Sequence, residues 1–270
     1  MVRSLHSSLV VRGRFKAFKT GNKGRTIMKT LNKVLVASAL SIGISSGAAA
    51  YTIDDQGADQ FIGQNTNVSD ADNLDVYGDP DIFEVFGMNV ASDLTSLYVD
   101  VYTNFRLGVS SYDFGDLFIS TDGWNPLGPA PYKSDGFGDG ETWEYAVDVS
   151  SRSDGIADLV DVSASSGFDV TSGLGTRVEQ EVTVSRNAPL DKAGDAGLSI
   201  STGALTKLSF EIALSDLGLS AMTPQEIGLR WSMTCANDIT EGSYTVPEPG
   251  TLALLGLGLL GLGMRKRVKS

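Results

Sequence analysis

Residues 208–215 read Leu208-Ser209-Phe210-Glu211-Ile212-Ala213-Leu214-Ser215, an alternation of large apolar side chains with polar or small ones. Because successive side chains of a strand point to opposite faces of a sheet, this period of two predicts a strand with one buried face. The same alternation recurs at residues 97–102 and 178–184. Further strand-like runs cover residues 82–90, 116–120, 142–149 and 227–234, and clusters of Gly, Pro, Asn and Asp separate them.

Many short strands without helical crossovers predict an all-β fold, namely an antiparallel β-sandwich of jelly-roll or lectin-like topology. Residues 215–219 and 223–226 each suit one helical turn, the second with Thr223 as N-cap and Pro224 in the first turn. Two long loops are expected at residues 122–140 and 148–175, the latter with one short strand near 156–162.

The charged residues divide the chain into pieces of different chemistry. Residues 1–50 contain nine Lys or Arg and no Asp or Glu, whereas residues 51–246 contain 32 acidic and eight basic residues, a formal charge of −24. We therefore predict an extended or non-native leader at 1–27, a signal peptide at 28–50, an acidic β-domain at 51–245 and a sorting tail at 246–270.

The signal peptide is predicted from three features in the right order. A cationic start at residues 28–33 precedes an apolar run at 34–44, and Ala48-Ala49-Ala50 supplies the small residues of a cleavage site. We expect signal peptidase to recognise Ala48 and Ala50. The apolar run forms a signal helix too short to span a bilayer, which requires about 20 residues.

The C-terminal tail carries the most specific motif of the chain. Pro247-Glu248-Pro249 precedes the apolar segment Thr251–Met264, and Arg265-Lys266-Arg267 follows it. As a helix this 14-residue segment would measure roughly 21 Å, less than the hydrocarbon core of about 30 Å, and its cationic end would stay on the cytoplasmic side.

This arrangement resembles the PEP-CTERM sorting signal of Gram-negative bacteria, on the residues Pro247, Glu248, Pro249, Arg265, Lys266 and Arg267. The resemblance implies transient anchoring in the inner membrane by the hydrophobic helix. It also implies recognition by an exosortase, a membrane cysteine protease that removes the tail near the motif. The expected destination is the cell envelope, the cell surface or the extracellular space.

The composition of residues 51–246 excludes several kinds of chemistry. They contain no histidine, so Ser-His-Asp and Cys-His catalysis and histidine metal sites are excluded. Cys235 is the only cysteine, which excludes an intramolecular disulfide, and we expect it to be buried. A strongly acidic domain with scattered basic residues repels phosphate and argues against nucleic-acid binding.

Carboxylates and aromatic residues supply the remaining candidate sites. Calcium is the one cofactor that the acidic loops suit, because it binds carboxylate oxygens, and the densest candidate set is Asp70, Asp72, Asp75, Asp79 and Asp81. The alternative is a solvated acidic surface with Asx turns. Trp124, Tyr132 and Trp143 are candidates for stacking on sugar rings, or else core residues. Glu141 and Glu144, or Glu179 and Glu181 on one strand face, could form a carboxylate pair for glycoside hydrolysis.

Three functions therefore remain open for the central domain. The first is a non-enzymatic surface or matrix protein associated with biofilm or exopolysaccharide. The second is a carbohydrate-binding or calcium-dependent lectin-like module. The third is a polysaccharide hydrolase that uses carboxylates.

Overall fold

The computed structural model describes residues 50–55, 76–136, 142–163, 168–170, 177, 179–185, 190–220 and 224–247. The chain divides into two compact units, Met1–Ser45 and Ser46–Ser270, and all described residues belong to the second. The predicted leader, the signal helix and the C-terminal hydrophobic helix lie outside the described residues, Ala50 excepted. Within the described ranges, no helix has the length and apolar character needed to cross a membrane.

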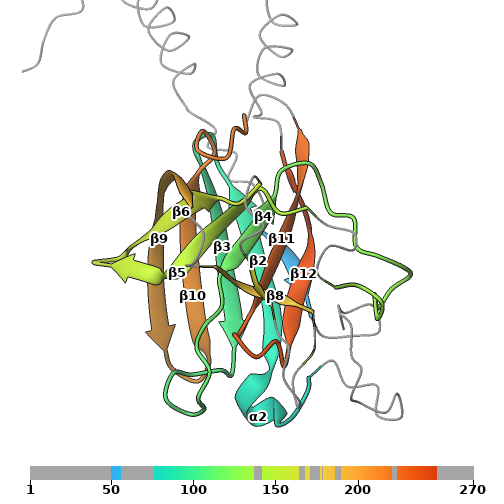
Figure 1. Ribbon diagram of the computed structural model, residues 1–270. Coiled ribbons are helices and arrows are strands. Elements are labelled where there is room, and N and C mark those ends of the chain that lie inside the picture. The colour runs from blue at the N-terminus through green and yellow to red at the C-terminus, as the bar shows by residue number, and fades with distance from the viewer. Residues whose placement is uncertain are drawn as a thin grey trace, which may run out of the picture. The chain divides into compact units, whose positions relative to one another are not determined.

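Antiparallel strands are the main regular secondary structure of the described residues, beside the short helix α2 (Figure 1). One sheet has the strand order β1-β2-β3-β10-β9-β6-β5-β4-β11-β12, and β7 pairs with β8 in a separate hairpin. The elements are β1 Tyr51–Asp54, α2 Pro80–Phe83, β2 Val85–Ser92, β3 Ser96–Thr103, β4 Leu117–Ser120, β5 Tyr145–Ser153, β6 Ile156–Asp161, β7 Phe168–Val170, β8 Glu181–Val184, β9 Asp191–Thr202, β10 Thr206–Ala213, β11 Gln225–Ser232 and β12 Ile239–Val246.

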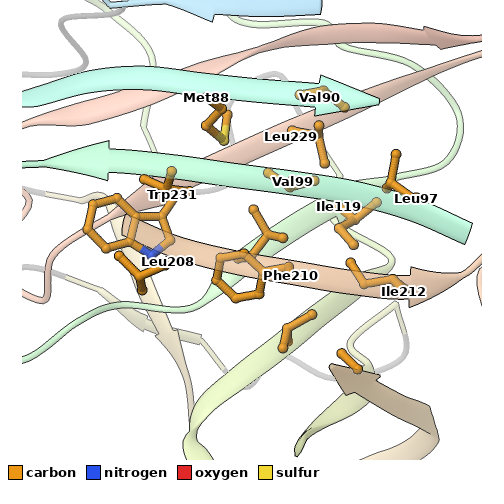
Figure 2. Packing of buried hydrophobic residues seen from close by; sticks show 14 of the residues in the cluster. Met88, Val90, Leu97, Val99, Ile119, Leu208, Phe210, Ile212, Leu229 and Trp231 are labelled. Carbon is orange, nitrogen blue, oxygen red and sulfur yellow. The ribbon is translucent and has the colours of Figure 1, made fainter. Parts of the chain in front are cut away.

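One hydrophobic core lies against the inner face of the ten-stranded sheet. Figure 2 shows Phe210 of β10 and Val99 of β3 packed with Leu229 and Trp231 of β11, although these strands lie far apart in the strand order. Each strand of this sheet contributes at least one residue to the core, and β12 contacts β1 and β2. The sheet is therefore folded over so that its two edge strands meet, and each large aliphatic side chain that it buries contributes about 1.5–3 kcal/mol.

The all-β prediction is confirmed, since the alternating runs at 97–102 and 208–213 are β3 and β10. The strand expected near 156–162 is β6. The two packed faces predicted as a sandwich belong to one continuous hydrogen-bonded sheet. The helical turn predicted at 223–226 is wrong, because Gln225 and Glu226 begin β11 and pair with Val246 and Thr245.

Three strands have no clear alternation and escape sequence-based prediction. β1 has four residues, β9 is rich in Gly, Ser and Asp, and β12 contains Thr, Gly and Ser among its apolar residues. These strands form because their neighbours supply the ladder: β9 lies between β6 and β10, and β12 pairs along its length with β11. Tertiary pairing overrides weak β-propensity here.

A second, smaller layer covers the outer face around β4, β5 and β11. Phe118, Trp143 and Val184 pack together there, and Val182 packs with Ala236 and Ile239. The chain crosses between β11 and β8 at Gly115, where an added Cβ would lie 2.4 Å from the carbonyl oxygen of Ser232 and 2.5 Å from that of Val182. Only glycine fits this crossing, because any side chain would collide with backbone on both sides.

Candidate functional site

The junction between the folded domain and the tail lies at the end of β12. Val246 pairs with Gln225, the first residue of β11, and is buried at the last register position of the sheet. The next residue, Pro247, is exposed and opens the sorting motif. Because proline has no backbone N–H to continue a ladder, the sheet ends where the motif begins. The other motif residues, Glu248, Pro249, Arg265, Lys266 and Arg267, lie outside the described residues.

The first strand of the domain lies beside this junction. Tyr51 directly follows the predicted signal cleavage site and pairs with Val90 of β2. Its ring lies 6.4 Å from that of Tyr244 in β12, measured between ring centroids. Further along, an added Cβ on Gly242 would lie 2.8 Å from Cγ2 of Ile53. The predicted signal peptide and the tail therefore join the domain at the same end; Ala50 is exposed and Ala48 lies outside the described residues.

A buried charged cluster lies on the outer face of β11 and β12. The Arg230 guanidinium is 1% exposed, and its Nη1 donates to Glu241 Oε2 at 2.5 Å. Its Nη2 donates to Gln180 Oε1 at 2.8 Å and lies 3.8 Å from Glu181 Oε2. Arg230 and Glu241 are direct register partners, so the sheet itself positions the ion pair.

Glu241 connects this cluster to the loop at residues 122–136. Trp124 Nε1 donates to Glu241 Oε1 at 2.8 Å, and the backbone N–H of Leu127 donates to Asp135 Oδ1 at 2.7 Å. Burial raises the pKa of Glu241 to about 7, against the opposing pull of Arg230 and the Trp124 hydrogen bond. The cluster thus fixes a long Gly- and Pro-rich loop to the outer face of the sheet.

The structure brings together two of the three aromatic residues predicted to stack on sugars. Trp124 and Tyr132 are both half-buried and lie edge-on, with ring centroids 5.2 Å apart. Trp143 lies elsewhere, 5% exposed and packed against Phe118 in the outer-layer core. The structure therefore divides the predicted aromatic set into a pair on the 122–136 loop and a core tryptophan.

The carboxylates predicted as a calcium set are only partly described. Asp79 caps α2 by accepting the Asp81 backbone N–H at 3.0 Å, and both residues are exposed. Asp70, Asp72 and Asp75 lie outside the described residues. Across the described ranges, no three His, Cys, Asp or Glu residues are placed to share a metal ion.

The interpretation of Glu179 and Glu181 as neighbours on one strand face is wrong. β8 begins at Glu181, whereas Glu179 precedes it with a left-handed φ of 57°. Glu179 is exposed and Glu181 is buried beside Arg230. The chain turns between them, so the period of two on which the interpretation rested does not extend to Glu179.

A buried carboxylate that the sequence did not single out, Asp116, joins two strands. Its Oδ1 accepts the Val149 backbone N–H at 2.7 Å, and its Oδ2 accepts the Val184 N–H at 2.8 Å, so it joins β5 to β8. Cys235 is buried as expected, and burial raises the pKa of its thiol to about 11. An acidic residue at the start of a strongly apolar strand was the one available signal for Asp116.

Pro247, the described residue of the proline motif, is exposed directly after the last strand of the acidic β-domain. Residues 245–267 match the family model described as the PEP-CTERM protein-sorting motif. The chain is a PEP-CTERM domain-containing protein, and the motif indicates exosortase-dependent sorting to the cell envelope and cell surface. No curated protein and no solved structure gives a significant match to the chain.

Proposed function

We propose that the folded domain is a non-enzymatic surface or matrix protein, delivered by exosortase processing and associated with biofilm or exopolysaccharide. The observation that supports this most directly is the junction at Val246 and Pro247, where the domain ends and the processing motif begins without a linker. A domain built this way is released whole, because cleavage within the motif removes no residue of a strand.

The acidic composition supports the same proposal. A formal charge of −24 over residues 51–246 keeps the released domain soluble and suits an ion-rich polysaccharide matrix. The buried carboxylates Asp116 and Glu241 accept hydrogen bonds from backbone or side-chain donors of the fold. They therefore act as structural acceptors, which is the role the proposal gives them.

The test compares cells that produce the full chain with cells that produce a chain ending at Val246, which retains every described strand. A second variant replaces Pro247, Glu248 and Pro249 with Ala, and a control variant replaces Pro126 and Pro129 of the 122–136 loop. We expect both tail variants to lose the surface fraction and the Ala variant to keep the unprocessed mass, while the control variant is processed and reaches the surface. If both tail variants reach the surface as the full chain does, the sorting proposal fails.

The pairing of Trp124 with Tyr132 favours carbohydrate binding as a second candidate function. Two half-buried aromatic rings on one fixed loop offer an apolar surface of the kind on which sugar rings stack. Saturable binding to an immobilised glycan panel should weaken in Tyr132→Ala and stay unchanged in Tyr112→Ala, an exposed aromatic outside this loop. Loss of glycan binding in EDTA would show that the binding depends on calcium. Equal binding by both variants would reject the aromatic pair as the binding site.

A further inference from the structure

The tail-proximal end of the domain carries an exposed apolar tip. We define this tip as Tyr51, the first residue of β1, and Leu94 in the turn between β2 and β3. Leu94 is 63% exposed and Tyr51 is 53% exposed. Tyr244 links them, because its ring lies beside that of Tyr51 and its hydroxyl is 3.0 Å from Ser92 Oγ, two residues before Leu94.

The turn that carries Leu94 is held rigidly. Asp93 Oδ1 accepts the backbone N–H groups of Thr95 and Ser96 at 2.7 and 2.8 Å, and its Oδ2 accepts the Tyr98 hydroxyl at 3.0 Å. This hydrogen-bonded turn leaves the Leu94 side chain out of the core. A large aliphatic side chain held in water by a fixed turn is ready to contact an apolar surface without further ordering.

The position of the tail determines which surface the tip meets. Thr251, where the apolar tail segment begins, is the fifth residue after Val246. Five extended residues span at most about 17 Å, so the end of β12 stays close to the bilayer for as long as the tail is inserted. The tip lies at this same end, beside Tyr244, whereas Val109 lies at the opposite end, beyond the last residue of β3.

We propose that, in the precursor that retains its tail, this tip rests in the lipid interface and orients the domain with the opposite end away from the membrane. Tyrosine and leucine suit this position, because an amphipathic ring settles at the headgroup level and an aliphatic side chain enters the acyl boundary. The tail supplies the proximity that makes a small contact effective, and cleavage by exosortase releases the contact together with the tail. This inference rests on the proposed sorting function.

The charge of the domain sets the lipid dependence of the contact. Asp93 is the acidic residue within the turn, and Glu226 is exposed next to the end of β12 as the register partner of Thr245. Anionic headgroups repel both carboxylates within about a Debye length. The tip should therefore contact zwitterionic phosphatidylcholine more closely than phosphatidylglycerol.

The experiment places a polarity-sensitive fluorophore on Leu94→Cys and, as the matched control, on Val109→Cys, an aliphatic residue that is 55% exposed. The two sites are separated by β3, whose eight residues extend about 25 Å. The native Cys235 is buried and keeps its thiol protonated, so the introduced thiol takes the label. Protein is purified from cells lacking exosortase, in which the tail is retained, and reconstituted into phosphatidylcholine vesicles with quencher-bearing lipids.

We expect quenching at position 94 to exceed quenching at position 109 at least about threefold, and to fall when phosphatidylglycerol is added. Equal quenching at both sites, or stronger quenching at 109, in protein that floats with the vesicles would overturn the orientation and leave the sorting function intact. Protein that does not float with vesicles at all would overturn both. The chain ending at Val246 serves as the control that should remain in the unbound fraction.

Discussion

The inner and outer faces of β11 and β12 are both shielded from water, by different means. The inner face presents Leu229, Trp231 and Tyr244 to the main core, as Figure 2 shows for the first two. The outer face presents Arg230 and Glu241, which are equally buried but satisfied by hydrogen bonds and charge. Burial alone therefore does not define the core of this domain, and the two faces should respond to substitution in different ways.

The largest effect is expected on the inner face. Trp231 is fully buried and its indole N–H donates to the Gly115 carbonyl at 3.2 Å, so Trp231→Ala leaves a cavity and an unpaired acceptor. We expect the free energy of unfolding to fall by about 4 kcal/mol. Urea unfolding followed by circular dichroism measures this loss, with Tyr112→Ala, an exposed aromatic, as the control. A loss below about 1 kcal/mol would show that the inner face is not a close-packed core.

On the outer face the pattern of loss distinguishes charge from packing. Arg230→Met removes the partner of Glu241 and should cost about 3 kcal/mol, because a buried carboxylate loses its charge-assisted hydrogen bond. The double variant Arg230→Met/Glu241→Leu should recover to within about 1 kcal/mol of the wild type, since no buried charge of the pair remains. A double variant as unstable as the single one would mean that the pair contributes net stability.

This contrast also explains what the sequence could predict. The inner face follows from alternation, because Leu208, Phe210 and Ile212 repeat every second residue and any strand with that pattern buries one face. The outer cluster does not follow, because Arg230 and Glu241 stand on strands whose register is set by tertiary pairing. A charged residue that alternates with buried apolar ones along a strand is typical of a solvent-exposed face. Here β8 and the 122–136 loop cover this face and bury it.

The candidate sites also differ in how far the sequence predicts them. Pro247-Glu248-Pro249 and the terminal cations all lie within one short C-terminal segment, so a local motif is sufficient to predict them. The pairing of Trp124 with Tyr132 and the separation of Trp143 depend on how a long loop returns to the sheet. Spacing in the sequence carries no information on that return.

The outer face should also make the stability of the domain depend on pH, through Glu241. Its pKa in the folded state is raised by burial to about 7, above that of an unfolded glutamate. The folded state therefore binds one more proton between about pH 4.5 and pH 7, and its stability falls as the pH rises through that window, by at most about 3 kcal/mol. Urea midpoints measured from pH 4.5 to 7.5 test this. Glu241→Gln should flatten the profile over that window, and an unchanged slope in that variant would assign the titration to another group.

A smaller effect is expected where the outer face holds its loop. Trp124→Phe keeps the ring and removes the N–H donor to Glu241, which should cost about 2 kcal/mol and raise the pKa of Glu241 further. Limited proteolysis within residues 122–136 should become faster, because the loop loses one of its hydrogen bonds to the sheet. In the Glu241→Leu background the same substitution should change neither quantity, and an equal loss there would attribute the effect to ring packing.

The smallest effect concerns Asp93, an exposed carboxylate whose pH response has the opposite sign. Hydrogen bonds from the backbone N–H groups of Thr95 and Ser96 lower the pKa of Asp93 to about 2, below that of an unfolded aspartate. Its contribution is therefore complete above about pH 4 and is lost as the pH falls towards 2. Asp93→Ala should cost about 1 kcal/mol at neutral pH, whereas Asp93→Asn keeps an acceptor for both N–H groups and should cost less while removing the acid-dependent loss. Stability is lost through Glu241 as the pH rises and through Asp93 as the pH falls. Unfolding of the double variant at pH 3 and at pH 7 should therefore assign each loss of stability to one carboxylate. A loss that persists after its carboxylate is removed would contradict the contrast between the buried and the exposed acid.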